Sequence, residues 1–206
     1  MSDNPFLKRA YQLKDQHDTQ AMYGDWADSY NQTMADHEYQ SPRRIVEALA
    51  RHCPDRDVAI FDVGCGTGLS GQALAQGGYT TIDGSDVSPE MVAIARGLDG
   101  IYQTLDVVTL DNPFPFEKGA YRVITAMGVI ADQHAPPETI GQLLDKLDAG
   151  GLLIFSLNNH TLENPKYLAA CHDAEAQGTA EILEQDSGPH MVKLGMTSKI
   201  MVLKKR

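Results

Sequence analysis

Short apolar runs alternate with longer, mixed segments along residues 58–158. Each run is rich in β-branched or aromatic residues and is followed by turn residues, a pattern typical of buried strands. Helix signals lie between the runs, such as Ser88-Pro89-Glu90, which provides an N-cap, a proline at the first helical position and an acid in the first turn. Strands that alternate with helices predict a mostly parallel sheet with right-handed crossovers. The expected strands begin near Val58, Tyr79, Leu105, Tyr121 and Leu152.

The chain before the first strand carries helix signals. Residues 4–34 are expected to be helical, and Phe6, Ala10 and either Leu13 or Tyr11 would share one face. Ser41-Pro42 begins a further helix that is expected to end near His52. Residues 1–56 would therefore form an N-terminal helical cover, and residues 57–206 the main domain.

The chain after the fifth strand predicts a different ending. A helix over 165–177 is followed by strand-like runs at 179–185 and 198–204, with Gly188-Pro189 and Gly195 between them. Two such runs joined by turn residues predict an antiparallel hairpin, here at the sheet edge. The whole pattern predicts an α/β, Rossmann-like, doubly wound sheet of about seven strands with this hairpin at its end.

The charge balance narrows the choice of substrate. The chain of 206 residues has a formal net charge of −11, and its basic residues are scattered except for the tail at 204–206. Proteins that bind nucleic acid usually present a basic stripe, because phosphate contacts supply much of their affinity. A small, neutral or cationic molecule is therefore the expected substrate, and nucleic acid is disfavoured.

Other features of the composition bear on compartment and metals. No run approaches the roughly 18 apolar residues that cross a bilayer, and residues 1–18 lack the apolar core of a signal peptide. Cys53, Cys65 and Cys171 do not have the spacing of metal ligands, and their odd number is consistent with a reducing compartment. A cytoplasmic protein without membrane association or a metal is expected.

A glycine-rich turn follows the first expected strand. Asp62 is followed by Gly64, Gly66 and Gly68, after which a helix-compatible run starts at Leu69. Glycine allows a positive φ and lets a ligand approach the backbone without an intervening Cβ. A strand that runs through such a turn into a helix N-terminus predicts a cradle for a nucleotide-like ligand.

The residues around this turn distinguish between two nucleotides. Gly66-x-Gly68-x-x-Gly71 fits the dinucleotide fingerprint, but the carboxylate of Asp62 would repel a pyrophosphate at the entrance. Asp62 suits a ligand with a positive group, which favours S-adenosylmethionine over NAD. Asp86, about 20 residues beyond the glycines, is placed to accept hydrogen bonds from ribose hydroxyls.

These motifs resemble the class I S-adenosylmethionine-dependent methyltransferases, of type 11/25, over about residues 23–157. The resemblance implies that the loop of Asp62, Gly64, Cys65 and Gly66 contacts the methionine part of the cofactor. It further implies that Asp86 binds the ribose, and that Val87, Met91, Asp106, Val107 and Met127 complete the cofactor site.

The chain departs from the family pattern at two positions, and one of its segments resembles a narrower subgroup. Arg122 stands where the family usually has aspartate, and Ala149 where it has proline; neither position is expected to touch the cofactor. The segment Asp25-Trp26-Ala27-x-x-Tyr30 is similar to the Williams–Beuren region methyltransferase-like subgroup. In the family an aromatic residue of the cover often contacts the methionine end, and Tyr23 and Tyr30 are the candidates here. Packing onto the core is an equally open role for both tyrosines, and Trp26 is expected to pack.

The expected reaction is in-line methyl transfer to an unidentified acceptor. Such a transfer depends mainly on positioning and on exclusion of water, and needs a base only if the acceptor loses a proton. His134, shortly after the fourth strand, is the candidate base, although a lone loop histidine is also a common surface residue. An NAD-dependent oxidoreductase and a non-catalytic S-adenosylmethionine-binding module are the alternatives. The acceptor atom and the oligomeric state are left open.

Overall fold

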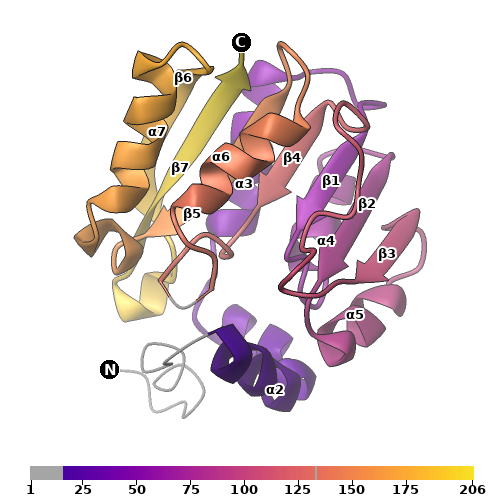
Figure 1. The fold of residues 1–206 in the computed structure, drawn as a ribbon. Coiled ribbons are helices and arrows are strands. Elements are labelled where there is room, and N and C mark those ends of the chain that lie inside the picture. Colours follow the sequence, from indigo (N-terminus) through magenta and orange to yellow (C-terminus); the bar gives the residue numbers. More distant parts are fainter. Residues whose placement is uncertain (1–15, 133) are drawn as a thin grey trace.

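The computed structural model describes residues 16–132 and 134–206, and Figure 1 shows their arrangement. Seven strands form one sheet in the order β3-β2-β1-β4-β5-β7-β6. The strands are β1 (Ile60–Val63), β2 (Ile82–Asp86), β3 (Thr104–Val107), β4 (Val123–Ala126), β5 (Leu152–Asn158), β6 (Ala180–Pro189) and β7 (Thr197–Lys205). Strands β1 to β5 pair in parallel, whereas β7 pairs antiparallel with both β5 and β6. The predicted sheet and its antiparallel ending are confirmed.

Helices cover both faces of this sheet. They are α2 (Gln16–Asp36), α3 (Ser41–His52), α4 (Leu69–Gln76), α5 (Pro89–Arg96), α6 (Glu138–Lys146) and α7 (Lys166–Ala176), with short 3₁₀ turns η1 (Thr161–Glu163) and η2 (Val192–Leu194). Apolar residues of α6 and α7 pack with Phe61 and Phe155 in one core, and those of α3 and α4 pack with Ile60 and Ile154 in a second core. Adjacent residues of one strand thus face opposite cores, as a doubly wound sheet requires.

Helix starts follow the signals in the sequence. The Ser88 hydroxyl accepts a hydrogen bond from the Met91 amide at 3.2 Å, and Pro89 occupies the first position of α5. Helix α3 begins at Ser41 and ends at His52, as predicted. The helical face expected at residues 6–13 lies outside the described residues, and the boundary between cover and main domain near residue 56 stays a prediction.

Strand β1 ends at Val63, so Asp62 lies inside the strand, where it is opposite Gly84 of β2 and Thr125 of β4. One expectation about the connections is wrong. The connection between β3 and β4 contains no helix in residues 108–122, although strict alternation of strands and helices was expected. Pro113 and Pro115 interrupt this connection, and proline removes an amide donor and disfavours helix in the residue before it.

The hairpin between β6 and β7 reaches back to the N-terminal part of the chain. The loop at its tip pairs with the segment after α2 through a bridge between Tyr39 and Met191, and the Gln40 amide donates to the His190 carbonyl at 2.8 Å. Met191 and Met196 pack against Trp26 of α2, whose side chain is almost fully buried. Helix α2, which lies below the sheet in Figure 1, is therefore fixed by the hairpin, and the predicted packing role of Trp26 is confirmed.

Candidate cofactor and acceptor site

A cavity of about 310 Å³ lies at the carboxyl ends of β1, β2 and β4, beside α2. Ligands of parallel α/β sheets bind at this edge, because the loops that follow the strands meet there. Its walls include nine residues predicted from the sequence, namely Tyr23, Tyr30, Gly64, Gly66, Asp86, Val87, Met91, Met127 and His134. Residues far apart in the chain are thus brought together at one site.

The glycine turn forms one wall of the cavity. Gly64 and Gly66 have φ angles of +62° and +54°, a conformation that side-chain-bearing residues rarely adopt. A Cβ on Gly64 would lie 2.3 Å from Val129, whereas a Cβ on Gly66 would meet no atom within 4 Å. Gly66 therefore borders open space in the cavity, where a ligand could approach the backbone.

The third glycine of the apparent dinucleotide fingerprint has a different role. A Cβ on Gly71 would lie 2.3 Å from the ring of Tyr102, so this glycine makes room for a tyrosine. The Gly71 amide donates to the Tyr102 hydroxyl at 3.1 Å. Gly71 therefore serves the packing of α4 against Tyr102 and does not face the cavity.

The end of β2 presents polar groups to the cavity. Asp86 Oδ2 accepts the Gly66 amide and Oδ1 accepts the Ser88 amide, both at 2.9 Å. Burial raises the pKa of Asp86, and these amide donors oppose the rise. The neighbouring Ser85 Oγ is buried and has no hydrogen-bond partner among the described residues. A buried hydroxyl without a partner in a cavity wall is a site for a polar ligand atom.

Four predicted residues do not line the cavity. Asp62 is fully buried within the sheet, and Cys65, 4% exposed, is buried beside it. Asp106 and Val107 are exposed at β3, and Val108 and Leu110 line the cavity in their place. The Val108 amide donates to the Asp86 carbonyl at 3.0 Å, which turns the chain inward one residue later than the motif suggested.

His134 lies in the cavity wall with both ring nitrogens engaged. Nδ1 lies 3.1 Å from the Asp132 carbonyl oxygen, and Nε2 lies 3.1 Å from the Tyr23 hydroxyl. A carbonyl oxygen only accepts, so Nδ1 carries a proton, and in the neutral ring Nε2 accepts from Tyr23. Burial lowers the pKa of His134, which favours the neutral ring. The site thus contains a neutral histidine whose Nε2 is able to take up a proton.

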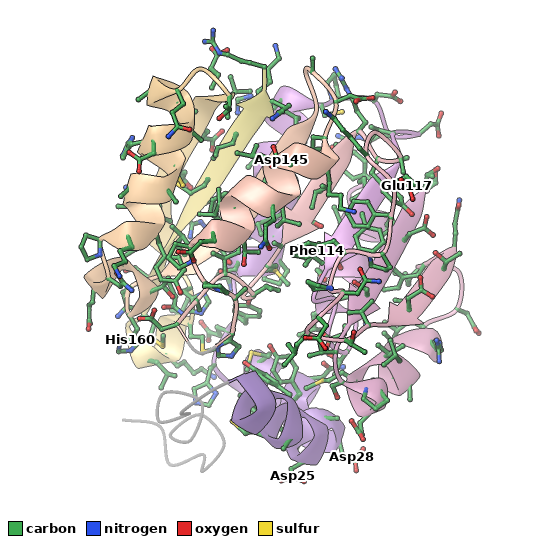
Figure 2. The ribbon with its side chains drawn as sticks, viewed as in Figure 1. Asp25, Asp28, Phe114, Glu117, Asp145 and His160 are labelled. Atoms are coloured by element: carbon green, nitrogen blue, oxygen red, sulfur yellow. The ribbon has the colours of Figure 1, made fainter. Side chains whose placement is uncertain are left out.

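The remaining wall comes from residues that sequence reasoning did not assign to the site. Leu110, Pro113 and Phe114 belong to the β3–β4 connection, and Thr139 and Gln142 lie one turn apart on α6. Phe114, labelled near the centre of Figure 2, is the aromatic residue that the β3–β4 connection adds to the cavity wall. Only their position after a predicted strand could have indicated these residues, because the segments that follow parallel strands surround the ligand.

Residues 16–132 and 134–206 contain neither a metal-binding cluster nor a membrane-spanning helix. No group of three or more His, Cys, Asp or Glu side chains in this part of the chain is arranged to hold a metal ion. None of the helices described there is long and apolar enough to cross a bilayer.

Comparison with known proteins identifies the family. Residues 34–184 match a family model described as a methyltransferase domain. Malonyl-[acyl-carrier protein] O-methyltransferase of Halalkalibacterium halodurans is 32% identical over 119 residues, which are 55% of this chain and 44% of that protein. The tRNA U34 carboxymethyltransferase of Cellvibrio japonicus is 28% identical over 123 residues, 58% of this chain and 38% of that protein. The chain thus spans less than half the length of either relative.

The fold has solved counterparts. Magnesium protoporphyrin IX methyltransferase from Synechocystis PCC 6803, crystallised with bound S-adenosylmethionine, superposes with a TM-score of 0.62 and 20% identity. The match covers 98% of this chain and 90% of that one. The family model covers most of the chain, and the fold and the glycine turn agree with it. This chain belongs to the class I S-adenosylmethionine-dependent methyltransferases.

Proposed function

We propose that this protein transfers a methyl group from S-adenosylmethionine to a hydroxyl group of a small, largely apolar acceptor. The observation that carries the proposal is the contact between His134 Nε2 and the Tyr23 hydroxyl inside the cavity. The O-methyltransferase activity in the name of one relative supports oxygen as the acceptor atom, and the choice of a hydroxyl rests on His134. The narrower likeness to the Williams–Beuren subgroup stays a prediction.

The residues in the cavity fit the cofactor. Gly66 leaves open space at the turn, Ser85 Oγ has no partner within the described chain, and Asp86 presents a carboxylate at the end of β2. Val87, Met91 and Met127 supply apolar walls. When bound, S-adenosylmethionine supplies a methyl group on a positively charged sulfur.

His134 explains why a hydroxyl is the favoured acceptor. A hydroxyl must lose its proton during methylation, and a neutral imidazole nitrogen within hydrogen-bond reach is suited to take it. The Tyr23 hydroxyl already donates to this nitrogen, so an acceptor hydroxyl that replaces it would meet the same base. The bond from Nδ1 to the Asp132 carbonyl holds the ring in this tautomer and stabilises the proton once it is transferred.

The walls of the cavity favour a small and apolar acceptor. Leu110, Phe114 and Val129 line it, and within the described residues no lysine or arginine does. An anionic acceptor would therefore lack a paired cation, and burying an unpaired charge is costly. One relative acts on tRNA, so transfer to tRNA is a competing function that the experiment includes.

The experiment measures formation of S-adenosylhomocysteine with small phenols and enols, matched amines and thiols, and tRNA. We expect turnover with hydroxyl compounds and, for His134→Gln, a loss in kcat of about 100-fold with unchanged cofactor affinity. His160→Gln is the matched control, because His160 lies outside the cavity wall and is labelled at the edge of Figure 2. Turnover of amines or tRNA alone, or an active His134→Gln, would contradict the proposal.

Two further outcomes identify the alternatives. Tight binding of S-adenosylmethionine without turnover of any acceptor would support the non-catalytic binding module. Binding of NADH in place of S-adenosylmethionine would support the oxidoreductase.

A further inference from the structure

We propose that Asp62 makes the site prefer the positively charged methyl donor over its neutral product, and that it does so through space, from behind the glycine turn. The inference rests on the proposed function, because it concerns the same cofactor. It differs from the direct contact between the glycine loop and the cofactor that the sequence resemblance implied.

Asp62 is held by three hydroxyl groups from three parts of the fold. Oδ2 accepts from Ser70 of α4 and, at 2.8 Å, from Tyr102 before β3, while Oδ1 accepts from Thr125 of β4 at 2.8 Å. The side chain has no exposed surface and does not line the cavity. Each carboxylate oxygen is therefore engaged within the protein, and the residue does not need the ligand as a partner.

The three hydroxyl groups can all donate to Asp62, which stabilises its carboxylate form. The Tyr102 oxygen accepts the Gly71 amide at 3.1 Å, so its own proton points to Asp62. A protonated acid would have to donate to one of the three hydroxyls, whereas a carboxylate accepts from all three. Gly71 and Gly84 have no Cβ where the Tyr102 ring lies, with Cβ contacts of 2.3 and 2.9 Å, so the backbone is shaped to admit this donor.

Other groups around Asp62 act on its ionisation. Burial is the largest effect and raises the pKa of Asp62, the negative charge of Asp86 raises it further, and the three hydroxyl donors lower it. Burial raises the pKa of both Cys65 and Tyr102 well above their usual ranges, so these neighbours stay neutral. The charge on Asp62 thus depends on its hydroxyl donors, which gives the proposal a second, independent test.

Asp62 is adjacent in the chain to residues that line the cavity. Val63 and Gly64 follow Asp62 directly and line the cavity, so the carboxylate lies behind its wall. A charge in a poorly hydrated interior acts over several ångströms because water does not screen it. The donor carries a positive sulfur and the product does not, whereas both carry the same ammonium and carboxylate groups. A fixed negative charge therefore favours the donor, and this attraction ends when the methyl group leaves.

The first test is Asp62→Asn, with dissociation constants for S-adenosylmethionine and S-adenosylhomocysteine measured by calorimetry at pH 7.5. We expect the preference for the donor over the product to fall at least five-fold, mainly through weaker donor binding. An equal loss for both ligands would indicate a contact with a shared group or a purely structural role, and would overturn the proposal, as would no change. A wild-type protein that binds neither ligand would instead refute the proposed function.

The second test keeps the carboxylate and removes one donor, and does not depend on how well Asp62→Asn folds. In Tyr102→Phe the pKa of Asp62 should rise, so the preference for the donor should disappear at a higher pH than in the wild type. Tyr79→Phe is the matched control, since Tyr79 is equally buried but its hydroxyl donates to the Cys53 carbonyl. Identical pH profiles for wild type and Tyr102→Phe would overturn the proposal.

Discussion

The Thr67 hydroxyl donates a hydrogen bond to the side-chain oxygen of Asn31, and this bond joins the glycine turn to α2. Thr67 is almost fully buried and directly precedes the last glycine of the turn. The helix that carries Tyr23 and Tyr30 is thus bonded to the loop expected to hold the cofactor. We therefore expect movements of α2 and of the turn to be coupled.

Breaking this bond should weaken cofactor binding. In Thr67→Val the Asn31 oxygen loses its partner, at a cost of about 1 kcal/mol, and α2 should separate from the turn more often. We expect a roughly five-fold weaker affinity for S-adenosylmethionine and faster amide exchange in α2. Thr80→Val, at an exposed position, is the control and should change neither quantity. Wild-type exchange rates in Thr67→Val would show that this bond does not hold α2.

Asp86 and Asp106 were both predicted to bind the cofactor, but only Asp86 lines the cavity. Asp86→Ala should weaken cofactor affinity about ten-fold or more without unfolding the protein, because Asp86 lines the cavity and holds the Gly66 amide. Asp106→Ala should change affinity little, because Asp106 is exposed and outside the cavity wall. Calorimetric titration measures both. A large loss of affinity in Asp106→Ala would show that Asp106 contacts the cofactor, as the sequence resemblance implied.

A methyl group at Gly66 should weaken cofactor binding more than it destabilises the folded protein. Gly66→Ala places a Cβ in open cavity space at φ +54°, with a backbone cost of about 1–2 kcal/mol. Gly100 has φ +72° and also has open space around a Cβ, so Gly100→Ala should cost similar stability and leave binding intact. Urea unfolding and cofactor titration distinguish the two effects. Equal affinity in both variants would argue against a ligand at the turn.

Acid should destabilise the protein through His190. This side chain is buried, lies 2.7 Å from the Ser41 hydroxyl, and is near Arg44, His160 and the Tyr39 ring. Burial, followed by the charges of Arg44 and His160, lowers the pKa of His190 to about 4. In the unfolded chain the ring takes up its proton near pH 6.5, so unfolding is favoured as the pH falls from about 6.5 to 4.

Protonation of His190 should lower the free energy of unfolding by about 3 kcal/mol between pH 6.5 and pH 4. Urea unfolding at several pH values should show it in the wild type and in His172→Gln, whose side chain is exposed. His190→Gln should lose this part of the pH dependence. An unchanged pH dependence in His190→Gln would place the titrating group elsewhere.

The sequence predicted the features that depend on local or periodic signals. The sheet, the hairpin and the start of α5 at Ser88 and Pro89 follow from apolar runs and capping residues. The position of Asp86 in the cavity wall follows from the rule that loops after parallel strands surround the ligand.

Side-chain partners distant in sequence were beyond the reach of such signals. Tyr102 is 40 residues from Asp62 and Tyr23 is 111 residues from His134, and no spacing pattern connects either pair. Val108, and not Asp106 or Val107, lines the cavity because of where the chain turns after β3. A shift of one residue along a strand points the side chain to the opposite face.

The contact between α2 and the hairpin can form only late in the synthesis of the chain. Met191 and Met196, which pack against Trp26, leave the ribosome long after α2 and the glycine turn. A nascent chain that has already formed β1 to β5 would still have α2 without its apolar partners. Competence to bind the cofactor should therefore arise late in synthesis, so unfinished chains would not sequester the methyl donor.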